Sequence, residues 1–158
     1  EFIEILNFLA NEYKIDVIVS THPRTRKKID ESNPALDNKV KFLKPLSFTE
    51  YNKLQISSRA VLSDSGTISE ESSILNFPAL NIRESHERPE AMEQASVMLV
   101  GFNKSRIKQS LKILDDQSRD KKRTLNVVED YSDSNISDKI IRIIISHIDF
   151  INTNTWHK

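Results

Sequence analysis

Residues 61–78 read VLSDSGTISEESSILNFP, and this stretch decides how the chain folds. A short apolar run ends at Ser63, Gly66 follows in a polar turn, and a helical pattern then continues to Asn76. The pattern predicts a strand, a tight turn and a helix in direct succession. Average usage would give a chain of this length about eleven glycines, yet it has only Gly66 and Gly101. A glycine at this turn therefore indicates a demanding backbone position.

Helical and strand-like patterns alternate on both sides of this stretch. Short apolar runs predict strands at residues 15–20, 40–45, 59–64, 78–83 and 97–101. Periodic apolar residues predict helices at residues 2–13, 47–58, 67–76, 88–96, 103–114 and 136–151. Ser47 with Glu50 forms a capping-box pattern, and Asn103 is a plausible cap. Regular alternation favours an α/β fold with a parallel sheet and helices on both faces.

Two segments are polar and less regular. Residues 21–34 begin as a loop and have room for a short helix, while residues 115–135 give no clear assignment. The apolar helix pattern at the start of the chain has no initiating methionine before it. We therefore expect the chain to be part of a longer protein.

Composition narrows the classes of function. The 158 residues suffice for one domain with a core, and the formal net charge is zero with scattered basic residues. This charge pattern weighs against nucleic acid as the main partner. The absence of cysteine excludes disulfides and thiol chemistry. No apolar run is long enough to span a membrane, and the N-terminus does not resemble a signal peptide, so we expect a cytoplasmic protein with no membrane partner.

Ligands of parallel α/β sheets bind beyond the carboxyl ends of the strands, so the loops after the strands are the candidate site. In the loop at residues 63–67, Gly66 precedes a helix whose first N–H groups could hold a phosphate. The alternative is an ordinary turn capped by Asp64 or Ser65, which a single glycine does not exclude and which the local pattern favours.

Three other features of these loops could be functional. Glu70 and Glu71 point about 100° apart on a helix, so one could accept the hydroxyls of a ribose while the other faces solvent. Helix-dipole stabilisation is the simpler explanation for both. His22 and Arg88 could bind phosphate oxygens, although surface roles are also compatible with them. We interpret residues 24–28 (RTRKK) as a solvated loop.

Residues 64–101 resemble, without gaps, the C-terminal half of the non-hydrolysing UDP-N-acetylglucosamine 2-epimerases. The family pattern is D-S-G-G, two glutamates, a small apolar helix and a P-V/A-L strand, then an arginine, T-E-R-P-E and a strand that ends in V-G. The segments S-T-H-P and F-L-K-P-L-S occur upstream in the right order. The resemblance covers most of the chain and is weakest after Ser105.

The resemblance implies a Rossmann-like domain, the C-terminal half of a two-domain enzyme with a GT-B-like fold. Residues 1–158 would form one UDP-binding domain, with the helix and tail at 136–158 packed partly on an N-terminal domain. His22 would contact the phosphates and steady the departing diphosphate as a catalytic residue. The residues that correspond to the UDP site are His22, Leu46, Tyr51, Ser65, Gly66, Thr67, Glu71 and Arg88.

These residues divide by the part of UDP that they would bind. Ser65, Gly66 and Thr67 correspond to the phosphate-binding turn, and Arg88 to the arginine of the nucleotide site. Glu71 corresponds to the glutamate that binds the ribose. Leu46 and Tyr51 lie where the family contacts the uracil, and Glu70 is left for solvent or helix electrostatics.

The chain also departs from the family pattern. Thr67 replaces the second glycine of D-S-G-G, Ser69 replaces a glutamine, and residues 85–86 (Ser-His) replace T-T. Leu46 replaces another glutamine, so only its backbone is left to meet the base. These changes resemble the branch that acts in capsule and surface-polysaccharide synthesis on UDP-linked deoxy-amino sugars of the L-fucosamine type.

The implied reaction inverts C2 of a UDP-N-acetylamino sugar by elimination and re-addition of UDP. The carboxylates that move the C2 proton would belong to the other half, and the full enzyme is expected to be a homodimer. Neither a metal nor a nicotinamide cofactor is implied. A UDP-sugar glycosyltransferase of the same fold is the main alternative. A receiver-type signalling domain, with Asp64 as the phosphorylated residue, is a weaker alternative, because the sequence shows no acidic partner for Asp64. A pure interaction module would leave the combined motifs unexplained.

Overall fold

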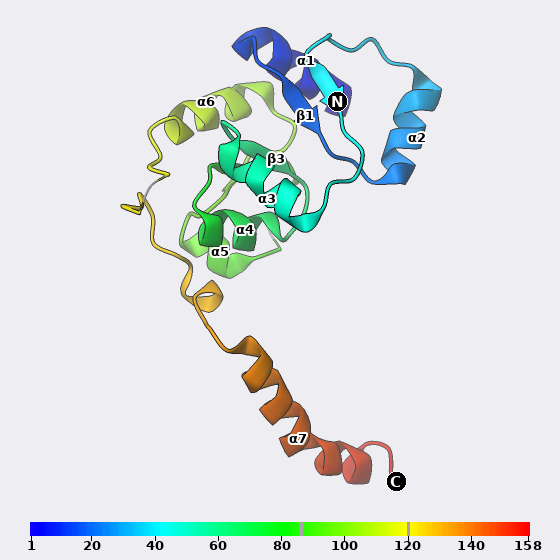
Figure 1. The fold of residues 1–158 in the computed structure, drawn as a ribbon, viewed down its shortest axis with the longest axis vertical. Coiled ribbons are helices and arrows are strands. Elements are labelled where there is room, and N and C mark those ends of the chain that lie inside the picture. The colour runs from blue at the N-terminus through cyan, green and yellow to red at the C-terminus, as the bar shows by residue number, and fades with distance from the viewer. Residues whose placement is uncertain (86, 120) are drawn as a thin grey trace.

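Helices and strands alternate along the computed structural model, which describes residues 1–85, 87–119 and 121–158 (Figure 1). The elements of the first half are α1 (Phe2–Tyr13), β1 (Val17–Val19), α2 (Pro23–Ser32), β2 (Val40–Phe42), α3 (Phe48–Ser57), β3 (Val61–Ser63) and α4 (Ile68–Leu75). The elements of the second half are β4 (Ala79–Asn81), α5 (Pro89–Glu93), β5 (Met98–Leu99), α6 (Lys104–Leu114), a 3₁₀ turn η1 (Glu129–Tyr131) and α7 (Ile136–Asn154).

The strands pair in parallel, but the ladder is in two parts. β1 pairs with β2, where Val17 is opposite Val40, and β4 lies between β3 and β5. The expected α/β class is therefore confirmed. The expected parallel sheet is present among the described residues as two separate ladders of short strands, and α1 packs on both of them.

The core lies on both faces of β4. Adjacent residues of a strand point to opposite faces, and here Leu80 packs with Ile5 of α1 and Ile107 of α6, whereas Ala79 packs with Ile68 of α4. All five of these side chains are buried, as is Phe77 at the entry to β4. Helices therefore cover both faces of this central strand, as the alternating sequence predicts.

Local sequence signals explain where several helices begin and end. Glu50 accepts a hydrogen bond from the Ser47 backbone while Ser47 Oγ accepts one from the Glu50 backbone, which confirms the capping box of α3. Asn103 Oδ1 accepts from the backbone of Arg106 at the start of α6. Asn76 ends α4 in the left-handed conformation, with φ of 57°. These caps define where α3 and α6 begin and where α4 ends.

The polar segment after α6 lies along the body of the molecule. Arg123 donates to the carbonyl oxygens of Ser73 and Ile74 at 2.6 and 2.7 Å, and so satisfies the last carbonyl groups of α4. Val128 is buried, and its backbone N–H donates to Ser73 Oγ. This segment leads into η1, whose position near α4 and α5 bears on the site.

Helix α7 extends away from the rest of the molecule (Figure 1). None of its residues is buried, and most of its isoleucines, together with Phe150, are exposed. Within the described ranges, no helix combines the length and the apolarity that a membrane span requires.

Candidate nucleotide-binding site

The turn between β3 and α4 presents backbone N–H groups and hydroxyls. Ser65 Oγ accepts a hydrogen bond from the Thr67 backbone at 3.3 Å and lies 3.0 Å from Thr67 Oγ1. Thr67 is the N-cap residue of α4 but makes no capping hydrogen bond with its side chain, and neither Asp64 nor Ser65 is the N-cap. For the backbone N–H of Gly66, the described part of the chain offers no partner. Unpaired donors at a helix N-terminus suit an anion.

Gly66 lies close to charged side chains from the loop before α5. It has no positive φ, unlike Gly101, whose φ is +55°. A Cβ on Gly66 would lie 2.8 Å from Oε2 of Glu87 and 3.6 Å from Nη2 of Arg88. Glu87 also forms an ion pair with Arg83 at 2.5 Å. The loop before α5 therefore closes over the Gly66 turn and brings a carboxylate and a guanidinium to it.

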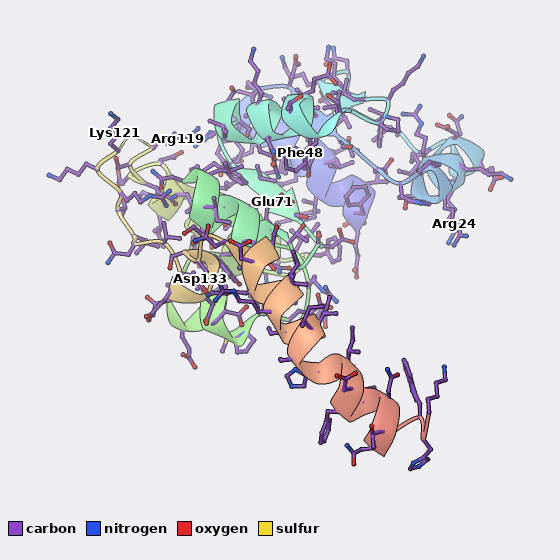
Figure 2. All side chains as sticks on the ribbon, turned by 60° about the horizontal axis from the view of Figure 1, so that its bottom comes forward. Arg24, Phe48, Glu71, Arg119, Lys121 and Asp133 are labelled. Carbon is purple, nitrogen blue, oxygen red and sulfur yellow. The ribbon has the colours of Figure 1, made fainter. Side chains whose placement is uncertain are left out.

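Glu71 is held by two donors from different elements. Gln55 Nε2 of α3 donates to Glu71 Oε2 at 2.6 Å, and Thr67 Oγ1 donates to Glu71 Oε1 at 3.0 Å. Figure 2 labels Glu71 on α4, which has α3 as its neighbour, with Phe48 labelled at the start of α3 and Arg24 on α2 well away from both. The predicted ribose-binding carboxylate is therefore fixed between α3 and the turn.

The prediction that Glu70 serves only solvent or helix electrostatics is wrong. Arg88 Nε donates to Glu70 Oε1 at 2.9 Å, and the other carboxylate oxygen, Oε2, is buried without a partner among the described residues. The hydrogen bond and the charge of Glu70 raise the pKa of Arg88. Because helix neighbours point about 100° apart, Glu71 turns to α3 while Glu70 turns to Arg88.

A second carboxylate and a tyrosine lie beside this ion pair. Tyr131 of η1 donates to Glu90 Oε1 at 2.8 Å. This hydrogen bond lowers the pKa of Glu90, whereas burial and the same bond raise the pKa of Tyr131 well above its ordinary value. The charge of the Arg88 guanidinium acts to lower the pKa of both Glu90 and Tyr131. The cluster joins α4, α5 and the segment that leads to α7.

Leu46 and Tyr51, the residues predicted at the base, flank the start of α3. Leu46 is half-buried directly before Ser47. Tyr51 is half-buried, and burial together with the Glu71 carboxylate raises its pKa. Tyr51 therefore lies within electrostatic range of the predicted ribose-binding group. Nearby Phe48, a residue that the sequence did not single out, is 78% exposed.

His22 is the N-cap residue of α2. Its Nδ1 accepts a hydrogen bond from the Arg24 backbone at 3.2 Å, so the proton of the neutral ring lies on Nε2. The side chain is exposed, as a group that meets a ligand must be. Over residues 1–85, 87–119 and 121–158 no hydrogen bond or ion pair joins His22 to the Gly66 turn. The structure thus brings Ser65, Gly66, Thr67, Glu71, Arg88 and Tyr51 together, and leaves His22 on a separate strand end.

Two residues at the site escaped prediction. Gln55 has a sequence signal, because it lies four residues after Tyr51 and so shares its helix face. Glu87 has none, since its place over Gly66 depends on how the loop folds. His86, at which the chain departs from the family pattern, lies outside the described residues. Within those residues no group of histidine, aspartate and glutamate side chains is arranged to hold a metal ion.

Comparison with known proteins identifies relatives. The family model described as UDP-N-acetylglucosamine 2-epimerase matches residues 1–145. The UDP-N-acetylglucosamine 2-epimerase of Campylobacter jejuni is 35% identical over 146 residues, which are 90% of this chain and 38% of that protein. Its counterpart from Methanocaldococcus jannaschii is 30% identical over 136 residues, 84% of this chain and 36% of that protein. This chain thus spans little more than a third of the length of these relatives.

Solved structures agree with the fold. The structure of UDP-N-acetylglucosamine 2-epimerase from Rickettsia bellii has a TM-score of 0.87 and 44% identity, and it covers all of this chain and 43% of its own. The M. jannaschii enzyme in complex with UDP-GlcNAc and UDP has a TM-score of 0.78 and 28% identity, over 92% of this chain and 40% of its own. The expected Rossmann-like domain of a GT-B-like fold is confirmed. The chain belongs to the UDP-N-acetylglucosamine 2-epimerase family.

Proposed function

We propose that this chain is the nucleotide-binding half of an isomerase, a UDP-N-acetylamino-sugar 2-epimerase, and that residues 1–158 form its single UDP-binding domain. The observation that carries the proposal is the set of contacts around Glu71 and Gly66 at the start of α4. Thr67 and Gln55 hold the Glu71 carboxylate, and Arg88 lies against the Gly66 turn. A carboxylate next to an anion-binding turn suits a ribose diphosphate.

Each part of UDP has a group of matching chemistry. The diphosphate binds the N–H groups and hydroxyls of Ser65, Gly66 and Thr67, with Arg88 as the cation. The ribose hydroxyls donate to Glu71, and the uracil lies against Leu46 and Tyr51. His22, whose neutral ring carries its proton on Nε2, donates to a phosphate oxygen. A solved relative, the M. jannaschii enzyme, was crystallised with UDP-GlcNAc and UDP.

The proposed reaction has two stages. The C2 proton is removed as the C1–O bond to UDP breaks, which leaves an unsaturated sugar and free UDP. C2 is then protonated on its other face, and UDP adds back at C1. The domain described here stabilises the departing diphosphate, since fixed donors aimed at developing charge act strongly. The carboxylates that move the proton belong to the N-terminal half of the enzyme.

Several finer proposals accompany this function. Residues 136–158 pack in part on the N-terminal half, because α7 exposes a broad apolar surface. The complete enzyme is a cytoplasmic homodimer. The departures at Leu46, Thr67 and Ser69 support a role in capsular or surface-polysaccharide precursor synthesis, with a deoxy-amino sugar as substrate. A glycosyltransferase of the same fold is not favoured, since the matched relatives are named as epimerases.

The test uses the complete enzyme with UDP-N-acetylglucosamine, and separately with a UDP-linked deoxy-amino sugar, in deuterated water. We expect NMR to show deuterium at C2 and a second, C2-inverted UDP-sugar. Transfer of the sugar to an acceptor without any epimer would instead support the glycosyltransferase. The UDP-sugar whose C2 proton exchanges faster identifies the branch of the family to which the enzyme belongs.

A further inference from the structure

Gln55 is a buried polar residue, and the two ends of its side-chain amide differ in their hydrogen bonding. Only 2% of the residue is exposed. Its Nε2 donates to Glu71 Oε2 at 2.6 Å, whereas its Oε1 is buried and has no partner within the described residues. Buried polar atoms are normally satisfied, so an orphaned carbonyl oxygen calls for a reason.

The orientation of the amide follows from its neighbour. An ionised carboxylate accepts hydrogen bonds only, so the NH₂ end of Gln55 must face Glu71 and the carbonyl oxygen must face the interior. A methionine of similar length would fill the same space without an unpaired oxygen. The glutamine is therefore explained by its polar neighbours: its amide donates to Glu71, and a hydrogen bond with Gln55 also acts to lower the pKa of Tyr51, against the burial that raises it.

The consequence of the contact is a fixed carboxylate. Gln55 binds one oxygen of Glu71 and Thr67 binds the other, so the carboxylate plane cannot rotate freely. Each oxygen has a second lone pair, and two oxygens with one free lone pair each suit two adjacent hydroxyls. Donors from α3 and from the phosphate turn thus hold the group in place before a ligand arrives.

We infer that Gln55 is a positioning residue that orients Glu71 to accept both hydroxyls of a ribose, and so makes this domain select ribonucleotides. The inference deepens the proposed function and rests on it. Gln55 acts through Glu71 and does not itself touch the ligand. Its loss should therefore affect only ligands that carry the hydroxyls.

The experiment measures affinities of the full 158-residue chain for UDP and for 2′,3′-dideoxyuridine diphosphate by isothermal titration. The variant is Gln55→Met, with Gln55→Leu as a second shape in the same space. Gln109→Met is the matched control, because Gln109 is an exposed glutamine on α6. Each variant is also made in a Glu71→Gln background, and its melting temperature is recorded.

We expect Gln55→Met to weaken UDP binding about tenfold and dideoxy-UDP binding by less than about twofold. In the Glu71→Gln background, Gln55→Met should have no further effect. An equal loss for both ligands, or none, would refute the positioning role while leaving the proposed function intact. If the wild-type chain binds both ligands equally, Glu71 does not read the ribose and the inference fails. If it binds neither, the proposed nucleotide site fails with it.

Discussion

Glu70 and Glu71 are adjacent in sequence, yet they contact different parts of the molecule. Glu71 is bound by Gln55 and Thr67, and Glu70 is bound by Arg88. At the scale of single residues, our proposal assigns Glu71 to the ribose and gives Glu70 the task of orienting Arg88 for the diphosphate. Both therefore contribute to nucleotide binding in the proposed function, one directly and one through Arg88.

Substitution of each glutamate by glutamine separates these roles. Glu71→Gln should weaken UDP binding by about 1–3 kcal/mol, the scale for a charged hydrogen bond left unmade. Glu70→Gln should cause a smaller loss, because Arg88 keeps its charge and loses only its orientation. Isothermal titration with UDP measures both, and titration with uridine separates the two, since only Glu71→Gln should weaken uridine binding. A larger loss at position 70 would contradict the assignment.

Glu87 provides a test of the anion site. Its carboxylate would lie 2.8 Å from a Cβ on Gly66, so it occupies the space that a diphosphate would approach. Like charges repel at this range, and Glu87→Gln should therefore tighten UDP binding while leaving uridine binding unchanged. Glu84→Gln, an exposed glutamate three residues earlier, is the control. Weaker UDP binding by Glu87→Gln would mean that this carboxylate supports the site.

At the scale of elements, much could be predicted and the reasons are local. The capping box at Ser47 and the cap at Asn103 were predicted, because each depends on residues within one turn. The helix predicted at 88–96 is present as α5, which spans Pro89–Glu93. Strand ends were predicted less well: the run at 15–20 forms a strand only at Val17–Val19. Ile15 is apolar but lies outside the paired residues, so composition alone does not mark where hydrogen bonding stops.

The candidate site divides in the same way. Glu71 and the Gly66 turn could be placed because both lie in one short motif. The Gln55 contact spans 16 residues and the Arg88–Glu70 pair spans 18, so both depend on tertiary packing that no local pattern encodes. The course of residues 115–135 could not be predicted either, because it is held by long-range hydrogen bonds such as those of Arg123.

His22 belongs to the element scale because it both caps α2 and faces the solvent after β1. In the complete enzyme, His22→Ala should lower kcat and not merely raise KM, since a group that steadies the departing diphosphate acts mainly in the transition state. His22→Ser keeps an N-cap oxygen and removes the imidazole. It should lower kcat as much as alanine does. Recovery of kcat by serine would reduce His22 to a helix cap.

An ion pair connects the chain just after α3 to the chain just after α6. Arg59 donates to both carboxylate oxygens of Asp115, at 3.0 and 2.8 Å, and this lowers the pKa of Asp115. A carboxyl whose pKa is lowered by folding stabilises the fold above its unfolded pKa, and the contribution is lost as pH falls through the lower folded value. The Asp115 contribution is thus present at neutral pH.

Asp115→Asn should lower the free energy of unfolding at pH 7 by about 1 kcal/mol or less, because both side chains are partly exposed and screened by solvent. The difference from wild type should shrink as pH falls below the ordinary aspartate value of 3.8. Urea unfolding between pH 7 and pH 3 measures it. Asp116→Asn, at an exposed neighbour, should show no such trend. A constant difference across this range would exclude the ion pair as the cause.

The whole molecule combines a packed body with an unpartnered helix. Ile140 and Ile144 of α7 are 49% and 51% exposed, and the apolar side chains extend along most of the helix. Polar residues such as Asp138, Arg142 and Asp149 share the opposite side. Apolar surface of this extent indicates a missing contact. In the proposed enzyme, the N-terminal half provides it.

The last prediction concerns the chain by itself. It should fold, because its two apolar clusters lie wholly within the body. It should self-associate through α7, and Ile144→Lys, on the apolar side of the helix, should reduce this association in sedimentation experiments without altering the melting temperature of the body. It should bind UDP weakly and should not exchange the C2 proton of a UDP-N-acetylamino sugar in deuterated water, because the proton-moving carboxylates and the closure that excludes water belong to the other half. NMR on the isolated chain and on the complete enzyme under identical conditions makes the comparison. Exchange at similar rates in both would place the chemistry within these 158 residues and overturn the proposed division between the two halves.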